Sequence, residues 1–172
     1  MRARNYREVK GQPYTRKKFV KGFPPPKITR FTMGDFESDF EYELELVALK
    51  KVQIRHSALE AARVTTNRYL SKMLAENYRL HIIPFPHVIL RENKMIFGAH
   101  ADRLQDGMRQ SFGRPIGTAA RVSTNQPIIR VYVDKEGVEA AKIALERASA
   151  KIPTACRIIT EKVESMEKVR QS

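Results

Sequence analysis

Acidic and hydrophobic residues alternate from Asp35 to Leu46, and this period of two predicts a half-buried β-strand. The strand can continue through Val47 to Ile54. One of its sides carries six carboxylates, which would repel a phosphate, so we expect that side to lie against solvent or the protein's own cations. Such regular spacing on an exposed side argues against paired carboxylates for acid–base catalysis.

Apolar residues then recur at helical spacing, and Ser57 followed by Glu60 matches a capping box. The pattern predicts a helix over Ala58–Asn77. The opposite face of that helix carries three cations, Arg63, Arg68 and Lys72. A phosphate-binding surface and an ordinary solvated face explain these cations equally well.

The remaining apolar runs predict five further strands and a second helix. Strands are expected at 79–85, 87–96 and 154–163, a hairpin at 118–123 and 127–133 with a turn at 124–126, and a helix from 137 to about 151. Strands and helices in this order predict an α+β fold with two helices packed on an antiparallel sheet.

A long segment without helical or strand period, 98–117, lies between two of these strands. Its glycines and Pro115 interrupt regular structure, and it carries three arginines, Arg103, Arg109 and Arg114. Loops of this length are usually functional or disordered. We expect a protruding loop whose two ends join paired strands, and the alternative is a polar insertion without a partner.

Charge indicates the class of partner. The chain of 172 residues has 32 Lys and Arg against 19 Asp and Glu, a net charge of +13 and a pI near 10.1, which favours a polyanion, first of all nucleic acid. It lacks an apolar run long enough for a membrane span and lacks a signal peptide, so we expect a cytoplasmic protein. Cys156 is the single cysteine, and neither a disulfide nor a zinc site is expected.

The basic excess is concentrated at the N-terminus, where residues 1–30 carry ten cations and one acid. We predict an extended RNA-binding arm from these cations, which alternate with aromatic rings and which are Arg2, Arg4, Arg7, Lys10, Arg16, Lys17, Lys18, Lys21, Lys27 and Arg30. The three prolines at 24–26 predict a stiff spacer that holds the arm away from the body. A solvated basic tail or an import signal is the alternative. A single domain at 31–164 and a polar tail at 165–172 would follow.

Candidate catalytic chemistry is sparse. The sequence contains no Walker loop, no GxGxxG and no GxSxG motif, so no cofactor is expected. The loop residues His100, Asp102 and Asp106 resemble a metal-dependent phosphohydrolase cluster, and an RNA-processing enzyme is therefore the alternative function. A glycine-rich loop would hold such a cluster poorly. His81 and His87 lack a third ligand and are expected to be packed or hydrogen-bonded.

Several longer motifs point to a family. The runs ADRLQDGMRQSFGRP, NKM at 93–95, SALEAAR at 57–63, GTAARV at 117–122 and YREVKGQPYTRKKFVKG in the arm resemble the L ten e family of archaeal and eukaryotic large-subunit ribosomal proteins, kin of bacterial L sixteen. The resemblance covers nearly the whole chain. It implies a non-enzymatic constituent of the large ribosomal subunit, with a hammerhead-like body.

The resemblance also implies partners and roles. The body and arm would bind large-subunit rRNA near the peptidyl-transferase centre and the A-site cleft, beside other large-subunit proteins, and the loop would reach toward tRNA acceptor ends. The loop roles would fall to Arg91, Lys94, Asp102, Arg103, Met108, Arg109, Phe112, Gly113 and Arg114. A separate translation factor that visits the ribosome transiently is a further alternative.

Overall fold

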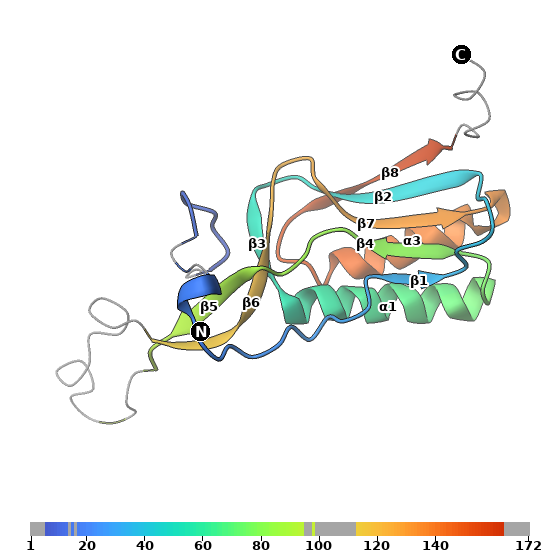
Figure 1. Cartoon of the computed structure of the whole chain (residues 1–172). Helices are drawn as coiled ribbons and strands as arrows, with labels where there is room; N and C mark the ends of the chain where they lie inside the picture. Colours follow the sequence, from blue (N-terminus) through green and yellow to red (C-terminus); the bar gives the residue numbers. More distant parts are fainter. Residues whose placement is uncertain (1–5, 14, 16, 95–97, 99–112, 164–172) are drawn as a thin grey trace, which may run out of the picture.

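The computed structural model describes residues 6–13, 15, 17–94, 98 and 113–163. Five antiparallel strands form the larger sheet, in the order β1 (Thr32–Gly34), β4 (Arg79–Ile82), β7 (Pro127–Val133), β2 (Tyr42–Ala48) and β8 (Cys156–Lys162). A smaller sheet contains three strands, in the order β3 (Val52–Arg55), β6 (Arg114–Val122) and β5 (Val88–Glu92). Two helices, α1 (His56–Leu74) and α3 (Val138–Ser149), pack on the larger sheet (Figure 1). The predicted α+β class is confirmed.

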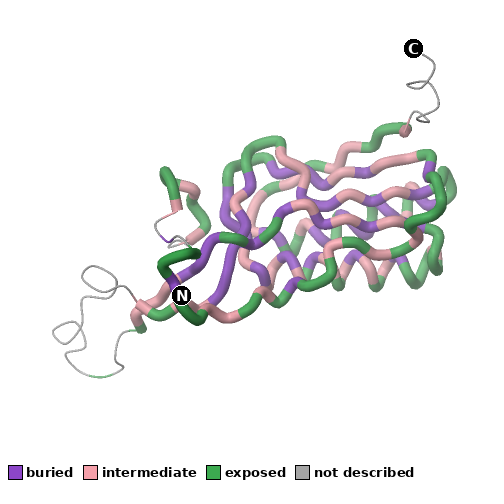
Figure 2. Tube along the Cα trace, in the orientation of Figure 1, coloured by how far each residue is buried: buried purple, intermediate pink, exposed green. Residues whose placement is uncertain are grey.

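The core lies between the helices and the larger sheet. Alternate residues of β2, Leu44, Leu46 and Ala48, are fully buried, as the period of two requires. The inner face of α3 consists mainly of alanines, and these small side chains let the helix pack closely on α1 and the sheet. Figure 2 shows the buried positions running along both sheets and the facing sides of the helices.

The predicted strand over 35–46 is correct only in its second half, because β2 begins at Tyr42. The Asp35 carboxylate accepts hydrogen bonds from the backbone N–H groups of Glu37 (2.8 Å) and Ser38 (3.4 Å) and from the Ser38 hydroxyl. This side chain-to-backbone bonding closes a turn, which competes with an extended strand. The turn forms despite the alternating sequence.

The predicted capping box is also wrong. Helix α1 begins at His56, Arg55 occupies the N-cap position without a side-chain cap, and Glu60 instead pairs with Arg63 at 2.5 Å. The helix ends at Leu74 because Ala75 adopts a left-handed φ of 53°. The helix therefore covers a range close to the prediction but has different ends.

The predicted hairpin of 118–123 with 127–133 does not exist, because the two segments lie in different sheets. Strand β6 pairs with β3 and β5, whereas β7 pairs with β2 and β4. Registers such as Val52 with Val122 and Leu46 with Ile129 show that β2–β3 and β6–β7 run beside each other as one bent antiparallel ribbon. The turn residues between 123 and 126 mark the bend of this ribbon.

The long loop connects β5 to β6, and the prediction that its ends join paired strands is confirmed. Strand β6 already begins at Arg114, so residues 114–117 belong to the strand and not to the loop. Residues 95–97 and 99–112 lie outside the described residues.

Gly34 is the position where the fold most strictly requires glycine. Its φ is +93°, and a Cβ added there would lie 1.9 Å from the Tyr78 carbonyl oxygen. We predict that Gly34→Ala lowers the free energy of unfolding by about 3 kcal/mol or more, since the backbone must shift as well as adopt a strained φ. Urea denaturation measures this loss.

The matched control is Gly22→Ala, because Gly22 also has a positive φ (+67°) but nothing lies within 4 Å of an added Cβ. The control should lose only the conformational cost of about 1–2 kcal/mol. Equal losses in the two variants would contradict the close approach at Gly34.

Candidate nucleic-acid interface

The N-terminal arm lies against the smaller sheet. The Gln53 backbone N–H donates to the Arg7 carbonyl (2.8 Å), and the Gln53 side-chain amide donates to the Tyr6 carbonyl (2.6 Å). The Arg121 guanidinium donates to the Gly11 carbonyl (2.6 Å). These bonds join the arm to β3 and β6, so the expectation that the arm stands away from the body is wrong for these residues.

The segment after the three prolines is also part of the body. Ile28 is 1% exposed within the core, and the Lys27 backbone N–H donates to His56 Nδ1 at 2.7 Å. The backbone of this segment is therefore bonded to the body, whereas its cationic side chains are exposed to solvent. Arg7, Lys10, Lys17, Lys18, Lys21, Lys27 and Arg30 are all exposed, and Arg2, Arg4 and Arg16 lie outside the described residues.

Two cations of the arm sit over aromatic rings. Lys18 Nζ lies 4.8 Å from the Phe19 ring centroid, and Lys17 Nζ lies 5.3 Å from that of Phe23. Phe19 is 68% exposed, which is unusual for a large apolar ring in water. Exposed rings beside cations can stack on unpaired bases while the cations contact phosphates.

The loop base lies at the same end of the molecule as the arm (Figure 1). Glu92 pairs with Arg114 and Arg91 with Pro115 in the β5–β6 ladder, and Lys94 and Arg114 are exposed. Gly113 has a positive φ of +70° immediately before β6. The other predicted loop residues, Asp102, Arg103, Met108, Arg109 and Phe112, lie outside the described residues, as do His100 and Asp106.

The three helix cations divide into two groups. Arg63 is largely buried and bonded to Glu60, and this hydrogen bond raises the pKa of its guanidinium. Arg68 and Lys72 are exposed in the C-terminal half of α1, away from the arm. Arg63 therefore has a partner within the protein. RNA contacts by Arg68 and Lys72 stay a prediction.

Acidic residues gather at the opposite end of the molecule. The turn at 35–41, the connection after β7 with Asp134 and Glu136, and Glu161 near the end of β8 all lie there. The remaining two carboxylates of the alternating run, Glu43 and Glu45, lie 3.2 Å and 2.6 Å from Arg130 Nε. The expectation that these acids face the protein's own cations is confirmed for this pair.

No metal site is visible within the described parts of the chain, where no three His, Cys, Asp or Glu side chains cluster. His87 Nδ1 lies 3.1 Å from the Phe85 carbonyl oxygen, and His81 lies in β4 opposite Thr32. None of the described helices is long and apolar enough to cross a membrane. The lone Cys156 is half-buried, which raises the pKa of its thiol.

Sequence reasoning missed several residues of the basic end. Gln53, Arg55 and Arg121 position the arm, and Arg55 lies 5.6 Å from the Tyr6 ring. These residues are brought to the arm by the pairing of β3 with β6, which a linear pattern does not reveal. The predicted helix began at Ala58, so no sequence pattern marked Arg55 as the residue before α1.

A basic end with exposed rings and an acidic opposite end are typical of a protein that binds a polyanion, here with an α+β fold. The chain matches the family described as ribosomal protein L16p/L10e over residues 9–159. Large ribosomal subunit protein uL16 of Staphylothermus marinus is 54% identical over 158 residues, covering 91% of this chain and 91% of that protein. The corresponding Sulfolobus acidocaldarius protein is 52% identical over 158 residues, covering 90% of each chain.

The chain therefore belongs to the ribosomal protein L16p/L10e family, and the resemblance expected from its motifs is confirmed. A ribosomal protein family is a family of structural components, so the expectation of a non-enzymatic protein agrees with it. The alternative of an RNA-processing enzyme built on His100, Asp102 and Asp106 finds no support in these similarities.

His56 joins three parts of the interface. His56 is the first residue of α1, and its Nδ1 accepts a hydrogen bond from the Lys27 backbone N–H. Its Nε2 lies close to Gly117 in β6, because a Cβ added at that glycine would lie 2.8 Å from this nitrogen. Burial, followed by the nearby charges of Arg55 and Lys27, lowers the pKa of this imidazole. The ring is therefore neutral near pH 7.

We predict that His56 destabilises the fold as the pH falls. The unfolded chain takes up a proton near pH 6.5, whereas the folded ring resists it, so the free energy of unfolding decreases below about pH 6.5. Urea denaturation at pH 7.5 and 5.5 measures this dependence. In His56→Asn, whose amide oxygen can still accept the Lys27 N–H, the dependence should be weaker. Identical pH dependence in both proteins would contradict the prediction.

Proposed function

We propose that this protein is a structural constituent of the large ribosomal subunit that binds large-subunit rRNA through its basic end. The observation that carries the proposal is the family membership together with the arm, whose exposed cations and rings lie beside the loop base. The acidic end would face away from the RNA, toward solvent or protein. The RNA carries out the chemistry of translation, and this protein positions and stabilises that RNA.

The proposal extends to the site on the ribosome. The body would lie near the peptidyl-transferase centre and the A-site cleft, and the loop between β5 and β6 would reach toward tRNA acceptor ends. The exposed positions of Lys94 and Arg114, at the ends of the chain that leave β5 and enter β6, support a loop base at the surface of the molecule. Stoichiometric retention on large subunits after a high-salt wash would separate a constituent from a transient factor.

We predict that the arm lysines contribute to RNA affinity through phosphate neutralisation. Replacing Lys17, Lys18 and Lys21 with Gln should weaken binding to purified large-subunit rRNA and reduce the slope of log affinity against log salt by about 2, since each contact contributes about 0.7–0.9. Filter binding over a range of salt concentrations measures the slope.

The matched control removes three lysines that do not lie on the arm, Lys135, Lys142 and Lys162, which are also exposed. That variant carries the same net charge and should retain a slope closer to that of the unmodified protein. Equal reductions in the two triple variants would show that only total charge matters, and would contradict a role for the arm.

The loop arginines have a separate predicted role. Replacing Arg103, Arg109 and Arg114 with Ala should leave the melting temperature of the isolated protein nearly unchanged, because substitutions of charged surface residues usually cost little stability and Arg114 is exposed. The same variant should impair subunit maturation or translation in cells. Sucrose-gradient polysome profiles and growth rates measure the effect, and normal profiles would count against the loop role.

A further inference from the structure

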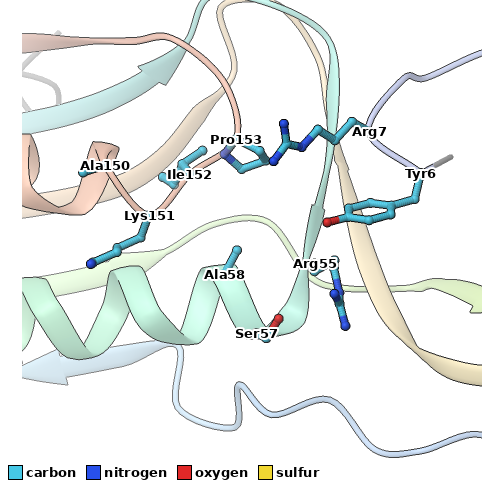
Figure 3. Close-up of a pocket in the computed structure, with 9 residues that line it drawn as sticks. All are labelled: Tyr6, Arg7, Arg55, Ser57, Ala58, Ala150, Lys151, Ile152 and Pro153. Carbon is cyan, nitrogen blue, oxygen red and sulfur yellow. The ribbon is translucent and has the colours of Figure 1, made fainter. Parts of the chain in front are cut away.

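A polar cleft opens where the arm, the start of α1 and the chain after α3 meet. Its volume is about 290 Å³, and its lining comes from three segments distant in sequence (Figure 3). Those residues are Tyr6, Arg7, Arg55, Ser57, Ala58, Ala150, Lys151, Ile152 and Pro153. A space of this size accommodates a phosphate group with part of an adjoining sugar.

The charges of the cleft all have one sign. Arg7, Arg55 and Lys151 line it, and no Asp or Glu belongs to the described lining. No ion pair to these three cations is formed by the described residues, and the nearby Glu8 pairs with Lys10 at 2.8 Å. Three uncompensated cations around one cleft favour an anion there.

Arg55 supplies the most specific observation. Its Nε atom is buried and has no hydrogen-bond partner among the described residues. A buried donor without a partner lowers stability, and a charged donor lowers it more. An anion that enters the cleft could accept this hydrogen bond and remove the cost.

Further hydrogen-bond donors surround the cleft. The first turn of α1 contributes Ser57 and Ala58, and that turn has no side-chain cap, so its N–H groups lack an acceptor from the N-cap position. In Figure 3 the Tyr6 hydroxyl and the Arg7 side chain extend from the arm into the space above this turn, and Arg55 runs down beside Ser57. Lys151 borders the space from the side of α3, with its ammonium group directed away from the arm. Donors and cations therefore come from both walls.

We infer that this cleft binds one backbone phosphate of RNA. The inference rests on the proposed function, since it names a specific contact within the rRNA interface. An RNA phosphate fits better than a protein carboxylate because it offers more acceptor oxygens to donors arriving from several directions, and because the Tyr6 ring, Ile152 and Pro153 provide apolar contact for a neighbouring sugar or base. Binding there would also fasten the arm to the start of α1.

The first experiment uses the full chain and inorganic phosphate as the probe. Backbone amide signals of Ser57 and Ala58 in ¹⁵N NMR spectra should shift saturably as phosphate is added. Both Arg55→Gln and Lys151→Gln should weaken the response at least about fivefold.

Lys151→Gln keeps the contact between Arg55 and Tyr6, so it remains informative even if Arg55→Gln loosens the arm. Lys162→Gln, an exposed cation at the acidic end, is the matched control.

The second experiment measures binding of the same four proteins to purified large-subunit rRNA over a range of salt concentrations. Each cleft variant should reduce the log–log slope by about 0.7–0.9, the contribution of one phosphate contact, while Lys162→Gln should not. Reduced slopes confined to the cleft variants support the inference even where free phosphate binds too weakly to saturate.

The outcomes separate the inference from the proposed function. If the unmodified protein fails to bind rRNA at low salt, the proposed function is wrong. If it binds rRNA and the cleft variants keep its slope, the cleft assignment is overturned and the proposed function stands, whether or not inorganic phosphate shifts the amide signals. A stronger response to acetate than to phosphate would overturn the choice of an RNA phosphate in favour of a protein carboxylate.

Discussion

The backbone of Ala48 bonds the two strands of the bent ribbon at the point where one sheet gives way to the other. Its N–H donates to the Gln126 carbonyl (3.1 Å), and its carbonyl accepts the Asn125 N–H (2.8 Å), at the point where β2 leads to β3 and β6 leads to β7. Asn125 lies between β6 and β7 and adopts a φ of 60°, which lets this connection turn alongside the connection between β2 and β3. The neighbouring Leu49 N–H donates to the Ala155 carbonyl (3.0 Å), so the strand leading into β8 is fixed at the same bend.

This bend determines where the functional groups lie. It directs the smaller sheet away from the helices, and thereby places the β5–β6 loop base at one extreme of the molecule. It also brings Gln53 and Arg121 to the positions from which they hold the arm. The arm is therefore ordered by hydrogen bonds to its backbone, which leaves its cationic side chains available to a ligand. A segment that looks disordered by composition can be held in this way because backbone groups carry no composition signal.

The sequence pattern correctly predicted the elements with strong periodicity. It failed for the features that depend on tertiary contacts, namely the pairing of strands and the start of a helix. The helices were found because their buried stripes recur at helical spacing, and β8 was found from its β-branched run. The hairpin after Thr118 was wrong because a turn signal does not say whether two strands fold back or continue in a bent ribbon. The capping box failed because Glu60 had a better partner in Arg63, one helical turn away.

The candidate site shows the same division. Charge and aromatic content predicted which cations lie on the surface of the arm, because ionised side chains rarely become buried without a partner. On α1, by contrast, one of the three predicted surface cations, Arg63, is largely buried, and its distance to Glu60 shows its partner. Neither Lys151 nor Arg55 could be assigned to a common cleft from the sequence, since almost a hundred positions separate them and only the packing of α3 on α1 brings them together.

The separation of charge along the molecule has a consequence for how it meets RNA. Cations collect at the end formed by the arm and the smaller sheet, and carboxylates at the far ends of β2 and β8. In the field of a polyanion, such a particle experiences a torque that rotates it before any contact forms. Diffusive encounters thus begin with the arm foremost, and fewer of them end in unproductive orientations.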